Sequence, residues 1–261
     1  MDLPQIESHP DPAEQRLRDS RRFRGAALVA TGFVAVLWWV RVFEHVFGDF
    51  TALALRPREA WGAIGILTAP LLHASFAHLL SNSLPLLILI TLSLAVVPRA
   101  AQRAFVLIWL GSGVSVWWLA RDSAHLGASG LAHGLMFFVF AIGLLRRERA
   151  AIAAALIAFF LYGGMVLTVL PGDPQVSWET HLGGALAGVL AALLWYRRDP
   201  APARKRYSWE DEEDAEAAHA DADPLEPARP QHVPVLWQRQ APSRGQVLRF
   251  PVRRPPDDDA R

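Results

Sequence analysis

The chain has 261 residues, is 52% hydrophobic and carries a formal net charge of +1, with ten Trp and no Cys. The lack of cysteine excludes disulfides, thiol catalysis and thiolate metal sites. A net charge this close to zero says little about partners. Nothing in the sequence resembles a nucleic-acid interface, so we expect no nucleic-acid partner.

The composition divides the chain into three parts. Residues 1–24 are polar and include acids, and no small-residue cleavage site follows the first apolar run, so we do not expect a cleaved signal peptide. Residues 25–198 consist of apolar runs separated by short polar breaks. Residues 199–261 hold 13 Asp/Glu, 10 Lys/Arg and 10 of the 19 prolines, with no helical or strand period. Such a segment buries too little apolar surface to offset its ordering entropy, which predicts a disordered tail.

Six apolar runs in the middle part are long enough to cross a bilayer as helices, which takes roughly 20 largely apolar residues. Near the end of the first run, Arg41 and Glu44 are three residues apart and are expected to pair on one helix face. The half-apolar stretch AWGAIGILTAPLL after this run is expected to lie in the interface without crossing. The composition therefore predicts an all-α polytopic protein embedded in a lipid bilayer. The six predicted spans are 25–47, 76–97, 104–120, 127–145, 151–170 and 181–197.

The arginines predict which side of the membrane each end of a span faces. They cluster before the first span and after the second, fourth and sixth. These clusters are Arg16, Arg18, Arg21, Arg22 and Arg24, then Arg99 and Arg103, then Arg146, Arg147 and Arg149, then Arg197 and Arg198. The opposite connections carry only Arg56, Arg58 and Arg121. By the positive-inside rule, both termini are expected to be cytoplasmic.

Hydrogen-bonding side chains gather at one end of the spans. His73 precedes the second span, and His78 and Asn82 lie four residues apart in its first turns, hence on one helix face. Ser129 opens the fourth span and His181 opens the sixth. The predicted orientation puts all these helix starts at the extracytoplasmic side. Because polar groups are costly inside a membrane, their convergence at one depth indicates a functional site.

Glycines give the fourth and sixth spans a reason to approach each other closely. Gly184 and Gly188 share a helix face with His181, and Gly130 lies beside Ser129 with another glycine four residues on. Small residues at this spacing let transmembrane backbones come into contact. Packing of this kind is expected to bring Ser129 within hydrogen-bond reach of His181. A serine hydroxyl needs such a neighbouring base to become a nucleophile.

A serine nucleophile also requires donors for the charge that develops on a carbonyl oxygen. The amide of Ser129 lies in the first turn of a helix, where N–H groups have no intrahelical partner. The side chains of His78 and Asn82 are candidates for further donors. Gly127, two residues before Ser129, leaves room for a substrate carbonyl.

Each motif alone also has a structural interpretation, as a packing stripe or a hydrogen-bonded core residue. A zinc site is a second interpretation, but the HExxH spacing is absent and no carboxylate lies inside the second, fourth or sixth span, so we expect no metal. The imidazoles available to such a site are His73, His78, His133 and His181. A transporter or channel is disfavoured because the spans show no inverted repeat and the polar groups cluster at one end.

Three ordered motifs resemble the rhomboid intramembrane serine proteases. They are HASFAHLLSN (residues 73–82), GASG (127–130) and HLGGALAG (181–188), on the second, fourth and sixth predicted helices. The resemblance covers about residues 25–198. It implies a six-helix bundle in a bacterial cytoplasmic membrane, with a water-accessible cavity that opens to the extracytoplasmic side. It also implies transmembrane protein substrates and a Ser–His dyad without a catalytic acid or cofactor; it does not set the oligomeric state.

The resemblance also implies roles for individual residues. Ser129 is similar to the family's nucleophile and His181 to its general base. His78, Asn82 and the Ser129 amide resemble the oxyanion hole, and His73 resembles a residue that supports that region. The supporting glycines are Gly127, Gly130, Gly184 and Gly188. Glu179 is two residues from His181 and thus on a different helix face, so we do not expect it to complete a triad.

The sequence departs from the family pattern at two places. Many bacterial members carry Trp-Arg in the first outer loop, where this chain has Ile64 and Gly65, so we expect that loop to be anchored differently. Members often have an aromatic residue four positions after the serine, stacked on the catalytic histidine. Here that residue is His133, which can stack in the same way or compete as the partner of Ser129.

Three functional hypotheses follow from these motifs. The first is an intramembrane serine endopeptidase that cleaves transmembrane segments near the extracytoplasmic side. The second is a catalytically inactive relative that binds transmembrane segments. The third is a processing protease of the rhombosortase kind, since Ser-x3-His-Gly resembles that branch; His181 and its glycines look more like ordinary rhomboids.

Overall fold

The computed structural model describes residues 12–173, 176–201 and 212–213. The chain divides into two units, residues 1–202 and 203–261, and the fold described below is that of the first. The predicted disordered tail lies outside the described residues, except for 199–201 and 212–213. The division into three parts at residues 24 and 198 stays a prediction.

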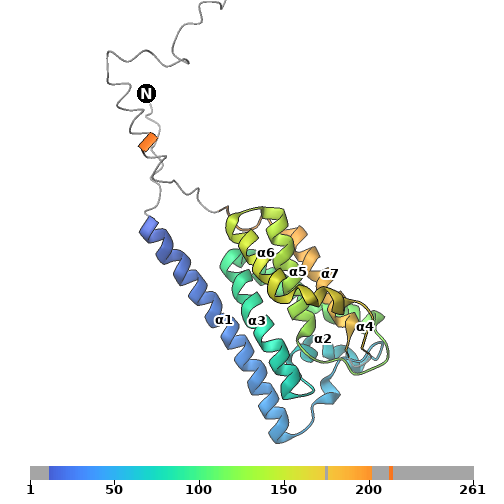
Figure 1. Cartoon of the computed structure of the whole chain (residues 1–261). Helices are drawn as coiled ribbons and strands as arrows, with labels where there is room; N and C mark the ends of the chain where they lie inside the picture. The colour runs from blue at the N-terminus through green and yellow to red at the C-terminus, as the bar shows by residue number, and fades with distance from the viewer. Residues whose placement is uncertain (1–11, 174–175, 202–211, 214–261) are drawn as a thin grey trace, which may run out of the picture. The chain divides into compact units, whose positions relative to one another are not determined.

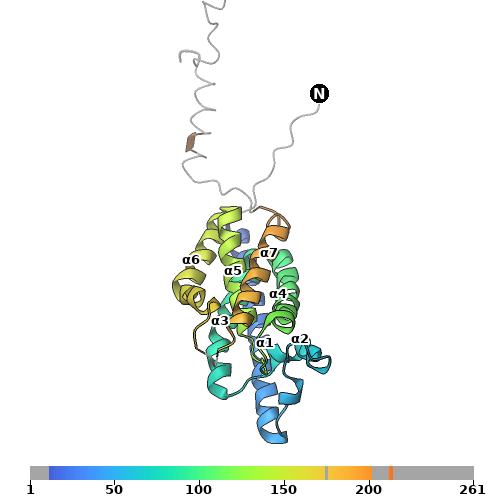
Figure 2. The same cartoon turned by 90° about the vertical axis from the view of Figure 1, so that its right-hand side faces the viewer.

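The first unit is a bundle of helices, and within the described ranges it contains no strand, only an isolated bridge between Leu55 and His125. In Figures 1 and 2, α5 runs through the middle of the bundle and α1 lies at its edge beside α3. This arrangement confirms the predicted all-α bundle. Its main helices are α1 (Pro12–Phe47), α3 (Phe76–Val96), α4 (Pro98–Leu119), α5 (Ser129–Arg146), α6 (Arg149–Tyr162) and α7 (Trp178–Trp195).

In the part of the chain that the structure describes, four helical segments are long and apolar enough to cross a membrane: α1, α3, α5, and α6 with its continuation to Val169. The helices α4 and α7 lie in the same bundle but carry more polar residues near their starts. Arg99 and Gln102 lie among the first five residues of α4, and the first turn of α7 contains Glu179 and His181. The count of six spans therefore stays a prediction.

The largest differences from the predicted spans are at the start of α1, at the start of α4, which is Pro98 instead of residue 104, and at the end of α6. The first helix begins at Pro12 instead of near residue 25, because its Arg, Leu, Ala and Glu residues are good helix formers outside as well as inside an apolar run. An ion pair between Glu14 and Arg18, 2.7 Å apart and one turn along the helix, adds to this. In the fifth predicted span, the α-helix ends at Tyr162. Two glycines follow, and the chain continues as the 3-10 helix η4 (Gly163–Val169).

The connection between α1 and α3 is folded into short helical turns. It contains η1 (Thr51–Leu53), η2 (Trp61–Ile64), α2 (Gly65–Thr68) and η3 (Ala69–Leu71). Its apolar helical stretch is only Trp61–Leu71, too short to cross a bilayer. Arg58 anchors the connection by donating to the carbonyl of Ala120 at 2.7 Å and pairing with Asp122.

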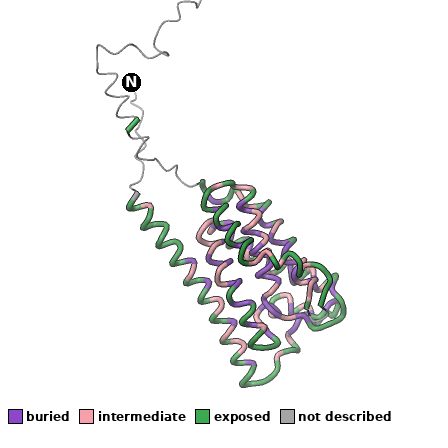
Figure 3. Tube along the Cα trace, viewed as in Figure 1, coloured by how far each residue is buried: buried purple, intermediate pink, exposed green. Residues whose placement is uncertain are grey.

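Close contact between α5 and α7 forms the centre of the bundle. A Cβ atom added to Gly184 or Gly188 would collide with the backbone carbonyl of Gly130 or Gly134, respectively. The two backbones therefore touch directly, as the glycine spacing predicts. Figure 3 shows most of α5 buried between its neighbours, whereas α1 is largely exposed.

At the end of the bundle where α3 begins, α1 is fastened to α3 by polar contacts within a mostly apolar face. The indole Nε1 of Trp38 donates to Ser83 Oγ at 3.0 Å. Arg41 and Glu44 form the predicted ion pair at 3.4 Å, and the guanidinium of Arg41 lies 5.1 Å from the ring centre of Phe76. Pairing inside the helix lowers the cost of burying Glu44, which is 8% exposed.

The opposite end of the bundle is closed by Asp199, which the sequence analysis assigns to the tail. Its buried carboxylate accepts hydrogen bonds from the backbone N–H groups of Arg99 and Ala100, at 3.0 and 2.9 Å. A carboxylate in this position caps the first turn of α4. Arg146 donates to the carbonyls of Tyr196 and Asp199 at 2.6 and 2.9 Å, so the chain after α7 is held against α5.

We expect Gly188→Ala to lower the melting temperature of the detergent-solubilised protein, because the new methyl group forces α5 and α7 apart at a backbone contact. Overpacking of this kind costs about 1–3 kcal/mol. The matched control is Gly32→Ala in α1, where a Cβ meets nothing within 4 Å. Equal melting temperatures for Gly188→Ala and the unmodified protein would contradict the close contact.

We expect Asp199→Ala to lower the free energy of unfolding of the first unit by about 0.5–2 kcal/mol, the usual effect of losing a helix cap. The exposed Asp19 of α1 supplies the control, and Asp19→Ala should leave the melting temperature unchanged. If the two variants unfold at the same temperature, Asp199 does not act as a cap.

Candidate active site

Ser129 and His181 meet where α5 and α7 begin. Ser129 is the first residue of α5, and His181 lies in the first turn of α7. Ser129 Oγ is 3.0 Å from His181 Nε2, within the range of a hydrogen bond. The imidazole is buried, with His181 6% exposed. The close glycine contact below the two residues is what brings their side chains within reach.

A backbone carbonyl fixes the orientation of the His181 ring. His181 Nδ1 lies 3.0 Å from the carbonyl oxygen of Thr168, in η4. A carbonyl can only accept, so Nδ1 carries the proton. In the neutral ring, Nε2 then has a lone pair that faces the hydroxyl of Ser129. The ring is therefore set to accept the serine proton.

Glu179 is directed away from His181, as its position on the helix predicts. Its carboxylate lies 3.5 Å from Arg121 Nε and accepts from Ser177 Oγ at 3.4 Å. The Thr168 carbonyl is thus the acceptor for the Nδ1–H of His181. In a Ser-His-Asp triad, a carboxylate accepts that hydrogen bond.

His133 stacks on His181. The ring centres are 3.8 Å apart and the planes are inclined by 10°. The two nitrogens of His133 are engaged elsewhere: Nδ1 is 2.7 Å from the carbonyl oxygen of Ser129, and Nε2 is 2.7 Å from Thr168 Oγ1. Of the two arrangements left open by the sequence, the stacked one is present.

Candidate oxyanion donors lie on α3, next to the segment that precedes Ser129. The ring of His78 packs against Gly127, where an added Cβ would lie 2.6 Å from His78 Cε1. Gly127 also has φ +116°, a conformation that favours glycine. One turn along α3, Asn82 is 5% exposed, and its Nδ2 has no hydrogen-bond partner among the described residues. Buried amide donors are rarely left unpaired.

His73 supports the same segment from the connection before α3. Its Nε2 accepts from the backbone N–H of Ala128 at 3.4 Å. Burial lowers the pKa of His73 to about 4, with a smaller contribution from His78, so the ring is neutral near pH 7 and can accept. His73 therefore holds the backbone next to Ser129.

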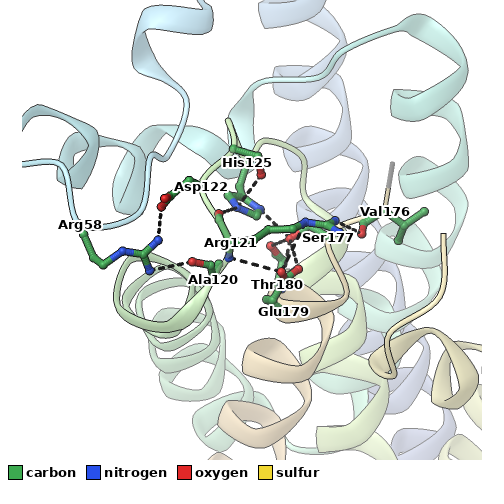
Figure 4. A network of polar contacts seen from close by, with 10 residues as sticks. Arg58, Ala120, Arg121, Asp122, His125, Val176, Ser177, Glu179 and Thr180 are labelled. Atoms are coloured by element: carbon green, nitrogen blue, oxygen red, sulfur yellow. Dashed lines mark hydrogen bonds and ion pairs between the residues drawn. The ribbon is translucent and has the colours of Figure 1, made fainter. Parts of the chain in front are cut away.

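A second polar network, which the sequence analysis missed, joins the loop before Ser129 to the start of α7 (Figure 4). His125 Nδ1 lies 2.7 Å from Ser177 Oγ, within hydrogen-bond distance, while the backbone of His125 pairs with Leu55. Ser177 caps α7 by accepting from the amide of Thr180 at 3.4 Å. The network fixes α7 one turn before His181. A serine just before an apolar helix is a capping signal, from which the role of Ser177 could have been predicted.

The available ring nitrogens do not assemble a metal site. In the described part of the chain, no three His, Asp or Glu side chains are grouped to hold an ion. His133 and His181 lie face to face, and their nitrogens are committed to Ser129 and Thr168.

The chain is similar to known proteins over most of its membrane part. The Rhomboid domain family model matches residues 57–198. An uncharacterized protein of Mycobacterium tuberculosis is 36% identical over 205 residues, which cover 74% of this chain and 83% of the relative. An uncharacterized protein of Mycobacterium leprae is 32% identical over 219 residues, covering 78% and 83%. A Bacillus subtilis protein named "Putative rhomboid protease YdcA" is 28% identical over 139 residues, covering 49% and 65%.

The matched region takes up more than half of the chain and contains the helix starts that carry His78, Asn82, Ser129 and His181. The relatives at 36% and 32% identity are each covered for more than two thirds of their length. Together with the helical membrane bundle, these matches lead to one conclusion: the chain belongs to the rhomboid family.

Proposed function

We propose that this rhomboid-family membrane protein is an intramembrane serine endopeptidase that cleaves transmembrane segments of other proteins. The observation that carries the proposal is the 3.0 Å hydrogen bond between Ser129 Oγ and His181 Nε2, with the opposite nitrogen of His181 held by a carbonyl. A nucleophile, a base and a group that orients the base are the three parts that serine hydrolysis requires.

In the proposed reaction, a substrate helix unwinds near its outer end and presents a carbonyl carbon to Ser129. The hydroxyl oxygen attacks that carbon while its proton passes to Nε2 of His181. His181 then gives the proton to the leaving amine as the peptide bond breaks. Water, activated by the same ring, hydrolyses the acyl-enzyme and restores Ser129. Proton transfer by a positioned side chain contributes roughly 100- to 10,000-fold to such a reaction.

The oxyanion is proposed to bind to donors from α3 and α5. Asn82 supports this assignment because its buried Nδ2 lacks a partner among the described residues and is free to donate when charge develops. The amide of Ser129, in the first turn of α5, and the ring of His78 are the proposed further donors. Preorganised donors of this kind stabilise the transition state more than the substrate.

The proposed orientation has both termini in the cytoplasm of a bacterial cell and the site near the extracytoplasmic face. It rests on the arginine clusters at the end of the bundle opposite to Ser129 and His181. The processing-protease hypothesis is less well supported, because the imidazole at Ser129 Oγ is that of His181, whose motif looks more like ordinary rhomboids. The nitrogens of His133 bond instead to the Ser129 carbonyl and to Thr168.

We expect a fluorophosphonate probe to label the unmodified protein and not the Ser129→Ala variant. His181→Ala should slow labelling at least about 100-fold, because the hydroxyl loses its base. Ser93→Ala is the matched control, since that hydroxyl donates within its own helix to the carbonyl of Leu89 at 2.6 Å. Equal melting temperatures would exclude unfolding as the cause. Labelling that persists in Ser129→Ala would remove the nucleophile assignment, and no labelling at all would favour the inactive binding protein.

Asn82→Leu should lower kcat for a cleavable transmembrane substrate by about 100- to 1,000-fold while leaving the melting temperature unchanged or raised. The loss follows from removing an oxyanion donor, and the stability follows from replacing an unpaired buried amide by an apolar group of similar size. Ser83→Ala provides the opposite pattern: it deprives Trp38 Nε1 of its acceptor, so stability falls while activity is kept. A strongly destabilised but active Asn82→Leu would contradict the proposed role.

A further inference from the structure

The carbonyl that orients His181 belongs to a segment with little packing of its own. Thr168 lies in η4, whose residues Gly163–Val169, all described, include none that is buried. The backbone hydrogen bond that defines the proposed base therefore depends on an exposed 3-10 turn. Such a segment is expected to be among the less stable parts of a protein unless specific contacts hold it.

The side chain of Thr168 makes that contact. Its Oγ1 lies 2.7 Å from Nε2 of His133, on α5. Nδ1 of His133 donates to the carbonyl of Ser129 at 2.7 Å, so in the neutral ring Nε2 is an acceptor and the threonine hydroxyl is the donor. The carbonyl of Met165, 2.9 Å from Thr168 Oγ1, is the competing acceptor within η4. The one hydroxyl proton goes either to α5 or back into its own turn.

Four residues thus form a closed circuit of hydrogen bonds. Ser129 Oγ bonds to His181, His181 bonds to the Thr168 carbonyl, the Thr168 hydroxyl bonds to His133, and His133 bonds back to the Ser129 carbonyl. The two imidazoles of the circuit, those of His133 and His181, also stack on each other. A displacement of η4 therefore changes the orientation of His181 directly.

We propose that Thr168 is a positioning residue of the site: its hydroxyl, anchored on His133, holds its own carbonyl where it orients His181. The inference rests on the proposed protease function and adds a specific residue to it. The carbonyl contact gains strength when His181 takes the serine proton, because a hydrogen bond from a charged donor is roughly twice as strong as one from a neutral donor. Misplacing the carbonyl should therefore affect the chemical step more than substrate binding.

Thr168→Val removes the hydroxyl and keeps the shape of the side chain and the backbone carbonyl. We expect kcat for a transmembrane substrate to fall about 10-fold, the effect of one lost hydrogen bond, with KM unchanged. Thr168→Ser keeps the hydroxyl and should retain most of the activity. Thr91→Val is the matched control, because the Thr91 hydroxyl bonds within α3 to the carbonyl of Leu87 at 2.6 Å.

A double-mutant cycle tests whether Thr168 acts through His133. His133→Phe keeps an aromatic ring at the stack and removes both nitrogens. In that background Thr168→Val should have no further effect on kcat, because the hydroxyl has already lost its partner. Independent, multiplying effects of the two substitutions would overturn the proposed coupling. An unchanged kcat in Thr168→Val would also overturn the proposal. The same holds if Thr168→Ser, which keeps the hydroxyl, loses as much activity as Thr168→Val.

Fluorophosphonate labelling separates failure of this inference from failure of the function. Ser129-dependent labelling in the unmodified protein, together with an unaltered rate in Thr168→Val, would overturn the role of Thr168 alone. A complete lack of Ser129-dependent labelling would overturn both proposals. Slower labelling of Thr168→Val at an unchanged melting temperature, with normal labelling of Thr168→Ser and Thr91→Val, is the result we expect.

Discussion

Direct backbone contact between α5 and α7 is the constraint on which the arrangement of the site depends. Gly184 and Gly188 face the carbonyls of Gly130 and Gly134 with no space for a side chain between them. Packing of this kind suits a membrane, where the hydrophobic effect does little to drive helices together and close van der Waals contact contributes more. The helix starts just beyond this interface are held at a fixed separation, and Ser129 occupies one of them.

The surroundings of His181 are made of neutral partners. The Thr168 carbonyl accepts from one ring nitrogen and the Ser129 hydroxyl faces the other. A second imidazole, that of His133, covers one face of the ring. A buried carboxylate in this place would need charged or hydrogen-bonding partners of its own, which are expensive to supply inside a membrane. Glu179, two residues from His181, is instead paired with Arg121 at the end of the helix.

Much of this arrangement could be predicted from local patterns. The apolar runs located the main helices, and the spacing of Gly184 and Gly188 after His181 indicated which helix faces meet. The starts of α5 and α7 were predicted within a few residues, because Ser129 and His181 lie where polar segments give way to long apolar runs. Helix ends were less predictable: α1 continues into an arginine-rich segment that is polar but has good helix propensity.

Contacts between segments far apart in the chain could not be predicted from local patterns. Thr168 is a lone threonine in an apolar stretch, and its partner His133 lies 35 positions away. His125 and Ser177 are 52 positions apart, and nothing in the composition of either segment links them. Asp199 was assigned to the tail because the average composition of the last 63 residues hides one carboxylate that caps α4. The position of His133 was compatible with two partners until the packing of α7 placed an imidazole over it.

The stacked imidazoles also make the site observable by spectroscopy. At a separation of 3.8 Å and nearly parallel, each ring lies in the aromatic ring current of the other. The ring protons of both histidines should therefore resonate upfield of those of an isolated imidazole, and a rotation of either ring changes the chemical shifts of both. Selectively labelled His133 would report the orientation of His181 in the intact protein, without any substitution at Ser129 or His181.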